Sequence, residues 1–172
     1  MAKSQKNPEK WPESVEVVVT MPKGSRNRYS VLKSAVKVEK VFPLPSVVET
    51  GFISGTESDD GNPLTAFVLV DEPTFPGCII SARPVGVLKL AKKDMYIDLI
   101  LLVPTADRRY DSITELEDVQ ESVKKDISNW FLGVSKMLVA PLDTAPAIQG
   151  WVGSAQAKNS IKHAADLFKR RH

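Results

Sequence analysis

Short runs rich in β-branched residues, each ended by Pro, Gly or charged residues, fill most of the chain up to residue 104. The first run, VEVVVTMPKG at residues 15–24, alternates in polarity and ends in a Pro/Gly turn. The next, at 28–42, contains two shorter pieces, and the others lie at residues 66–73, 77–91 and 96–104. Regular short strands with such turns are typical of sandwiches and barrels. The sequence therefore predicts an all-β core of one of these two kinds.

Two helices are predicted after the strands. Thr114 and Glu117 have the spacing of a capping box, which favours a helix start at Thr114. The apolar residues that follow at helical spacing are Leu116, Val119, Val123, Ile127, Trp130, Phe131 and Val134. We expect Trp130 and Phe131 to pack in the core rather than stack on a ligand. A second apolar stripe after Ser154 predicts another helix, so the two helices are expected near residues 114–133 and 155–169.

Composition excludes several classes of function. The chain has 172 residues, which suits a single domain at 15–172 after a flexible arm at 1–14. A net charge of only +2 gives no general affinity for polyanions, so we expect no nucleic-acid partner. The longest apolar run, at 96–104, is too short for a membrane span. With no signal-like segment either, a cytoplasmic location is expected, and the interior of an organelle stays open.

The cysteine and histidine content argues against several common catalytic groups. The single cysteine, Cys78, cannot form an internal disulfide, and its apolar neighbours favour a buried thiol. The two histidines, His163 and His172, both lie near the C-terminus. No Ser/His/Asp or Cys/His arrangement can be assembled from them.

Four longer phrases carry a family resemblance. They are MPKGSRNRY, GFISGTESDDGNPL, VLVDEPTFPGCIISARPVGVLKL and DRRYDSITELEDV, followed by Gly150-Trp151 before the last helix. In this order and spacing they resemble the soluble family I inorganic pyrophosphatases over roughly residues 15–170. The resemblance implies an α+β, mainly β fold: a small, closed, OB-like β-barrel from about Val15 to Pro104, flanked by two α-helices. It also implies a homo-oligomer.

The resemblance further implies hydrolysis of diphosphate with several Mg²⁺ ions, which bind through carboxylates, waters and phosphate oxygens. The family's metal motif, D-G-D-P-x-D, stands here as DGNPLT. Asp60 keeps the first acid, whereas Asn62 and Thr65 replace the second and third by neutral oxygens. We therefore expect Mg²⁺ to bind weakly or not at all. The family's next acidic positions are occupied by Lys92, Lys93 and Ile97.

The phosphate-binding positions are also thinned. Arg28 stands at a family lysine and Lys40 at a family arginine, so these two keep a positive charge. The acid or tyrosine positions, and a Tyr-Lys pair in the first helix, are held by Thr20, Ser30, Ser46, Thr50, Val134 and Ser135. No residue is predicted as catalytic from this pattern.

Three interpretations follow. The first is a pyrophosphatase-family protein that has lost catalysis and acts as a structural or regulatory subunit, in a homo-oligomer or with a protein partner. The second is a divergent but active diphosphatase with a re-formed metal site, built from Glu57, Asp59, Asp60, Asp94 and Asp98. The third is an anion-binding module that uses Arg28 and Lys40. Three or more carboxylates converging at the barrel mouth would favour the second, whereas Ile97 and Val134 plugging it would disfavour the second.

Overall fold

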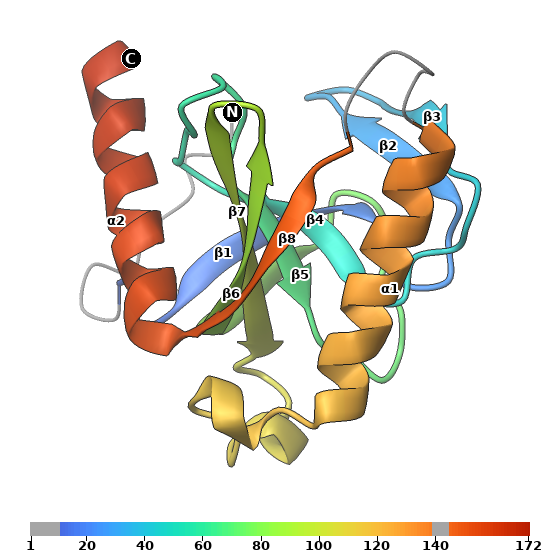
Figure 1. Ribbon diagram of the computed structural model, residues 1–172. Helices are drawn as coiled ribbons and strands as arrows, with labels where there is room; N and C mark the ends of the chain where they lie inside the picture. Colours follow the sequence, from blue (N-terminus) through green and yellow to red (C-terminus); the bar gives the residue numbers. More distant parts are fainter. Residues whose placement is uncertain (1–10, 139–144) are drawn as a thin grey trace.

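The computed structural model describes residues 11–138 and 145–172 (Figure 1). The strands are β1 (Val15–Met21), β2 (Asn27–Val31), β3 (Val36–Val41), β4 (Glu49–Ile53), β5 (Thr65–Val68), β6 (Ile79–Lys92), β7 (Met95–Pro104) and β8 (Ala147–Gly153). The helices are the 3₁₀ turns η1 (Arg108–Tyr110) and η2 (Leu116–Asp118), and the α-helices α1 (Glu121–Leu138) and α2 (Ser154–Arg171).

Five strands form a closed ring in the order β1-β4-β5-β7-β6, because β6 also pairs with β1. The pairing of β5 with β7 is parallel and the other ring pairings are antiparallel. Strand β8 adds to β6 outside the ring, and β2 and β3 form a separate hairpin. The mainly β fold with two flanking helices is thus confirmed (Figure 1).

The two faces of β6 and β7 serve two apolar cores. On β6, Leu88 belongs to a first core, which includes Trp130 of α1. Its neighbour Val87 belongs to a second core, which includes Ile161 of α2. Successive side chains of a strand point to opposite faces, so this alternation lets one strand anchor both helices. Trp130 packs edge-to-face on Phe67, with ring centroids 6.3 Å apart. Its predicted place in the core is confirmed, and the side chain is buried.

The predicted start of the first helix is wrong. Helix α1 begins at Glu121 rather than near Thr114, and η2 precedes it. The reciprocal cap belongs to η2 and joins Glu115 with Asp118, whose carboxylate also accepts from the Thr114 backbone N–H at 3.0 Å. The pair that caps is thus Glu115 with Asp118 rather than Thr114 with Glu117, and it starts a single 3₁₀ turn. Helix α2 begins at Ser154, within a residue of its predicted start.

Several other expectations from the sequence can be compared with the structure. Strands β4 and β8 were not predicted from the alternation of residues. Cys78 is partly exposed rather than buried. The expected flexible arm falls mostly on residues 1–10, outside the described residues, and Trp11 packs partly buried against the second core. Within the described part of the chain, no helix combines the length and the apolar character that crossing a bilayer requires.

A buried carboxylate ties two loops to the ring. Glu49 begins β4 and has none of its surface exposed. Its side chain accepts hydrogen bonds from the backbone N–H of Lys23 at 3.1 Å, and from the backbone N–H and hydroxyl of Thr74 at 2.9 Å each. These bonds satisfy both carboxylate oxygens, which burial would otherwise make costly.

We expect Glu49→Ala to lower the free energy of unfolding by about 2 kcal/mol, because it leaves the partly buried donors of Lys23 and Thr74 without their acceptor. Urea unfolding measures this through the transition midpoint at constant slope. The matched control is Glu72→Ala, which removes an exposed acid from the same loop as Thr74. Equal midpoints for the two variants would show that Glu49 does not stabilise the fold in this way.

Candidate functional site

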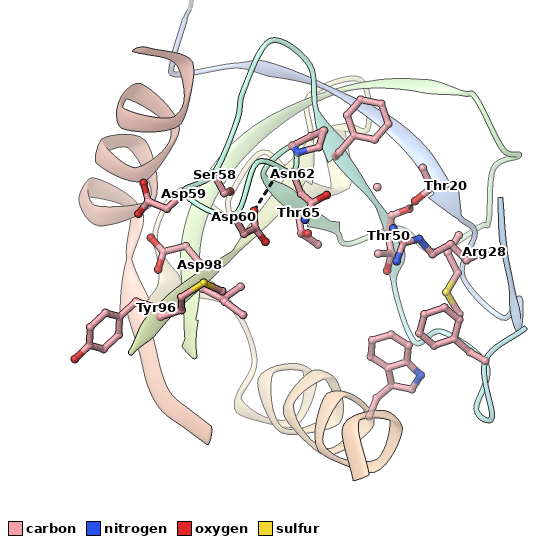
Figure 2. Close-up of a pocket in the computed structure, with 18 residues that line it drawn as sticks. Thr20, Arg28, Thr50, Ser58, Asp59, Asp60, Asn62, Thr65, Tyr96 and Asp98 are labelled. Atoms are coloured by element: carbon pink, nitrogen blue, oxygen red, sulfur yellow. Dashed lines mark hydrogen bonds between the residues drawn. The ribbon is translucent and has the colours of Figure 1, made fainter. Parts of the chain in front are cut away.

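A cavity of about 330 Å³ lies on one side of the ring (Figure 2). Its wall combines residues of β1, β2, β4, β5 and β7, the loop of residues 54–64 between β4 and β5, and Trp130 of α1. A larger cleft, of about 630 Å³, lies beside the start of α1, and its wall contains none of the predicted metal or phosphate positions. The first cavity is therefore the candidate functional site.

The three metal positions predicted from the sequence lie together in the wall of this cavity. Asp60 and Asn62 belong to the loop, and Thr65 is the first residue of β5 (Figure 2). The turn is closed by hydrogen bonds from the backbone N–H of Ser58 to the Asn62 carbonyl, at 2.7 Å, and from that of Gly61 back to Ser58. Gly61 has φ +84°, a left-handed conformation that glycine adopts without strain.

Asp60 braces this turn itself. Its Oδ1 accepts a hydrogen bond from the backbone N–H of Asn62 at 3.0 Å, which is the geometry of an Asx turn. Asp60 is exposed and lines the cavity. One charged ligand and two neutral oxygens are thus what the motif presents at this wall.

Of the two predicted phosphate-binding residues, one lines the cavity and the other does not. Arg28 lines the cavity, at the end where Thr20 and Thr50 also lie (Figure 2). Its Nε lies 3.3 Å from the carboxylate of Glu39, and both side chains are about half exposed. Lys40 pairs with Arg28 across the β2–β3 hairpin but is not part of the cavity wall; its Nζ lies 5.7 Å from the centroid of the Phe42 ring.

The remaining family positions are also placed. Ile97 lines the cavity, whereas Lys92 and Lys93 are not part of its wall. Val134 is buried in the first core and does not plug the cavity. Ser46 is buried, and its hydroxyl donates to the Val48 carbonyl at 2.6 Å.

Three carboxylates line the cavity, those of Asp59, Asp60 and Asp98. Asp98 is fully engaged: Oδ1 lies 3.0 Å from the ammonium of Lys89, and Oδ2 accepts from the Ser160 hydroxyl at 2.6 Å. Asp59 lies 3.8 Å from the His163 ring. In residues 11–138 and 145–172, no three His, Cys, Asp or Glu side chains are grouped so that they could hold a metal ion. The acids reach the cavity without forming a ligand cluster.

Helix α2 supplies contacts that the sequence did not reveal. Ser160 and His163 reach Asp98 and Asp59 from more than sixty residues away in the chain. No sequence pattern couples these positions, because the contact depends on how α2 lies against β6 and the loop. The amphipathic stripe of α2 was the only available signal, and it predicts a packed helix rather than particular polar partners.

Glu57, proposed above as a metal ligand, instead anchors the loop to α2. Its carboxylate hydrogen-bonds to Arg171 and lies 3.2 Å from the His172 ring, and its backbone N–H donates to the Ala164 carbonyl. The hydrogen bond from Arg171 is the main cause that holds the pKa of Glu57 below its ordinary value of 4.5. Neither Glu57 nor Asp94 is part of the cavity wall.

The ion pair of Glu57 predicts a pH dependence of stability. A carboxyl whose pKa is depressed in the folded state stabilises the protein above about pH 4.5, and this contribution is lost as the pH falls through the lower folded-state value. We expect Arg171→Met to lower the urea midpoint at about pH 5.5, and this difference to shrink at a lower pH, below the folded-state pKa of Glu57. Arg170→Met, which removes an exposed neighbouring charge, is the control. A midpoint difference that persists at the lower pH would contradict this role.

Comparison with known proteins agrees with the fold. The profile of the inorganic pyrophosphatase family matches residues 17–169. The inorganic pyrophosphatase of Haloferax volcanii is 36% identical over 162 residues, which are 92% of this chain and 90% of that protein. That of Streptomyces coelicolor is 31% identical over 160 residues, which are 90% and 95% of the two chains. The crystal structure of the Thermus thermophilus enzyme has a TM-score of 0.86 at 29% identity, covering 93% and 94% of the two chains. The chain belongs to the inorganic pyrophosphatase family.

Proposed function

We propose that this chain acts on diphosphate in the cavity described above, and that its rate of hydrolysis is far below that of a member with all the family's acids. The observation that carries this proposal is how few carboxylates of the cavity are free to bind a metal ion. Asp60 is the one carboxylate at the three motif positions, and the nearby Asp98 is held by Lys89 and Ser160. Family membership supports diphosphate as the substrate.

The physical reason is the charge that Mg²⁺ requires. Mg²⁺ binds through carboxylates and substrate phosphates with near-octahedral geometry, and it gives up water reluctantly. Asn62 and Thr65 offer oxygens without charge, and Ile97 offers none. The residues of this cavity therefore do not fit a cluster of several magnesium ions. Phosphoryl transfer depends mainly on electrostatic stabilisation, so loss of the ions removes most of the catalytic effect.

A second candidate is a divergent but active diphosphatase. It is favoured by the relatives, which are named inorganic pyrophosphatases and match about nine tenths of the chain. It is also favoured by Asp59, Asp60 and Asp98, which together line the cavity. The comparisons support this candidate better than the first, whereas the hydrogen bonds of the acids support the first better. A direct assay separates the two.

A slow or inactive enzyme would act through its surfaces, and we propose that the chain forms a homo-oligomer or joins a protein partner. Exposed apolar side chains support this proposal, since their burial against another chain would lower the free energy of the assembly. On the β2–β3 hairpin they are Leu32, Val36, Val38 and Val41. A cytoplasmic location stays a prediction.

We expect Mg²⁺ and Mn²⁺ to bind more weakly than micromolar, because the motif presents one carboxylate in place of three. Isothermal titration calorimetry of the purified protein with each ion measures this. Asp60→Asn serves as the control for any heat that comes from other acids. Micromolar binding that is lost in this variant would show that Asp60 still centres a metal site.

We expect diphosphate hydrolysis to be at least about a hundredfold below that of a relative such as the Thermus thermophilus enzyme, since loss of one electrostatic contact typically costs that much. The measurement is phosphate release from diphosphate with Mg²⁺, on protein purified free of the expression host's own pyrophosphatase. Asn62→Asp with Thr65→Asp is expected to restore little, because Ile97 and the engaged Asp98 are unchanged.

The control variant is Asp60→Ala. Robust turnover that disappears in Asp60→Ala would establish the active diphosphatase in place of the slow one. Turnover that persists in this variant would not depend on Asp60, so it would come from the other acids of the cavity or from a contaminating enzyme.

A further inference from the structure

The two ends of the cavity differ in charge. One end holds the guanidinium of Arg28 with the hydroxyl-bearing Thr20 and Thr50 (Figure 2). The other end holds the carboxylates of Asp59 and Asp98, opposite Arg28 (Figure 2). Inorganic diphosphate is anionic along its whole length, so without bridging cations one of its ends would face carboxylates of the same sign. A ligand with an anionic end and a hydroxyl-bearing end fits this division.

The acidic end continues into a second hollow. This hollow, of about 310 Å³, is bounded by helix α2 and shares Ser58, Asp59, Tyr96 and Asp98 with the cavity. Its α2 side includes, beside Ala164, four residues whose side chains can both donate and accept hydrogen bonds: Gln156, Asn159, Ser160 and His163. Amides, hydroxyls and imidazole recognise the edges of a base or a sugar, and they are not the groups that bind an isolated phosphate best.

An exposed aromatic ring stands where the two hollows meet. Tyr96, close to the tip of the β6–β7 hairpin, is 78% exposed and lines both hollows. Figure 2 shows it beside Asp98, on the side of the cavity away from Arg28. Exposure of so much aromatic surface is costly in water, and stacking a nucleic-acid base on such a ring recovers about 1–3 kcal/mol.

We propose that the joined hollows bind a nucleoside diphosphate. Its phosphates lie at the Arg28 end, its sugar hydroxyls donate to Asp59 or Asp60, and its base stacks on Tyr96 toward α2. The engaged state of Asp98 supports this occupant, because a carboxylate already bonded to Lys89 and Ser160 needs no metal ion as counter-charge. The inference uses the cavity of the proposed function, but it does not depend on hydrolysis.

The test is calorimetric titration of the full chain with ADP, UDP and inorganic diphosphate, in buffer that contains EDTA so that no metal ion bridges protein and ligand. We expect at least one nucleoside diphosphate to bind about fivefold or more tightly than inorganic diphosphate, the difference that one stacked base contributes. Tyr96→Ala is expected to abolish this difference and Tyr96→Phe to keep it. Arg28→Met is expected to weaken the binding of all three ligands.

The matched control is Phe75→Ala, which removes another exposed ring that lies in neither hollow. The inference is overturned by equal or tighter binding of inorganic diphosphate, by no binding of any ligand, or by a nucleotide preference that survives Tyr96→Ala. These outcomes are separate from the proposed function, because the phosphate-release assay on inorganic diphosphate gives its own result. Rapid hydrolysis there would overturn the slow enzyme and leave the comparison of binding intact.

Discussion

Strand β6 is the element on which the rest of the molecule depends. Its fourteen residues pair with β1, β7 and β8, and the pairing with β1 closes the ring. Gly86 lies at a crowded point within it, because a Cβ at this position would lie 2.8 Å from the Leu116 side chain and 3.1 Å from the Val152 carbonyl. A closed ring leaves no free edge between β1 and β6, so the relative positions of the cavity walls are set by backbone hydrogen bonds.

The same strand supplies a counter-charge to the acidic wall. Lys89 of β6 stands opposite Asp98 of β7 in the antiparallel register, and their side chains form an ion pair. Helix α2 adds Ser160 to Asp98 and Arg171 to Glu57. Closely spaced carboxylates repel one another unless counter-charges or hydrogen-bond donors lie among them. In a metal site the ions take this role, whereas here side chains of the protein take much of it.

The sequence predicted the parts of this arrangement that follow from local pattern. Alternation in 15–24 predicted β1, and the β-branched run at 77–91 predicted β6. The motif at residues 60–65 singled out Asp60, Asn62 and Thr65, which lie at one wall of the cavity. Strand β4 was not predicted, because its residues ETGFI do not alternate cleanly in polarity and include a glycine that packs against β1. The hydrogen-bond and ion-pair partners of the acids were not predicted for a different reason. Ser160 and Arg171 meet the site through the docking of α2, which is a tertiary effect with no local pattern.

Asp60 shows why a retained acid need not mark a retained metal. In the Asx turn its carboxylate bonds the backbone N–H of Asn62, so the residue contributes to the loop conformation whether or not an ion is present. Asn62 can replace an acid without cost to this turn, since it takes part through its backbone N–H and carbonyl. The backbone frame of the motif and its charge are therefore separable. A chain can keep the first for folding while it changes the second, and the ligand that the cavity prefers then changes with the charge.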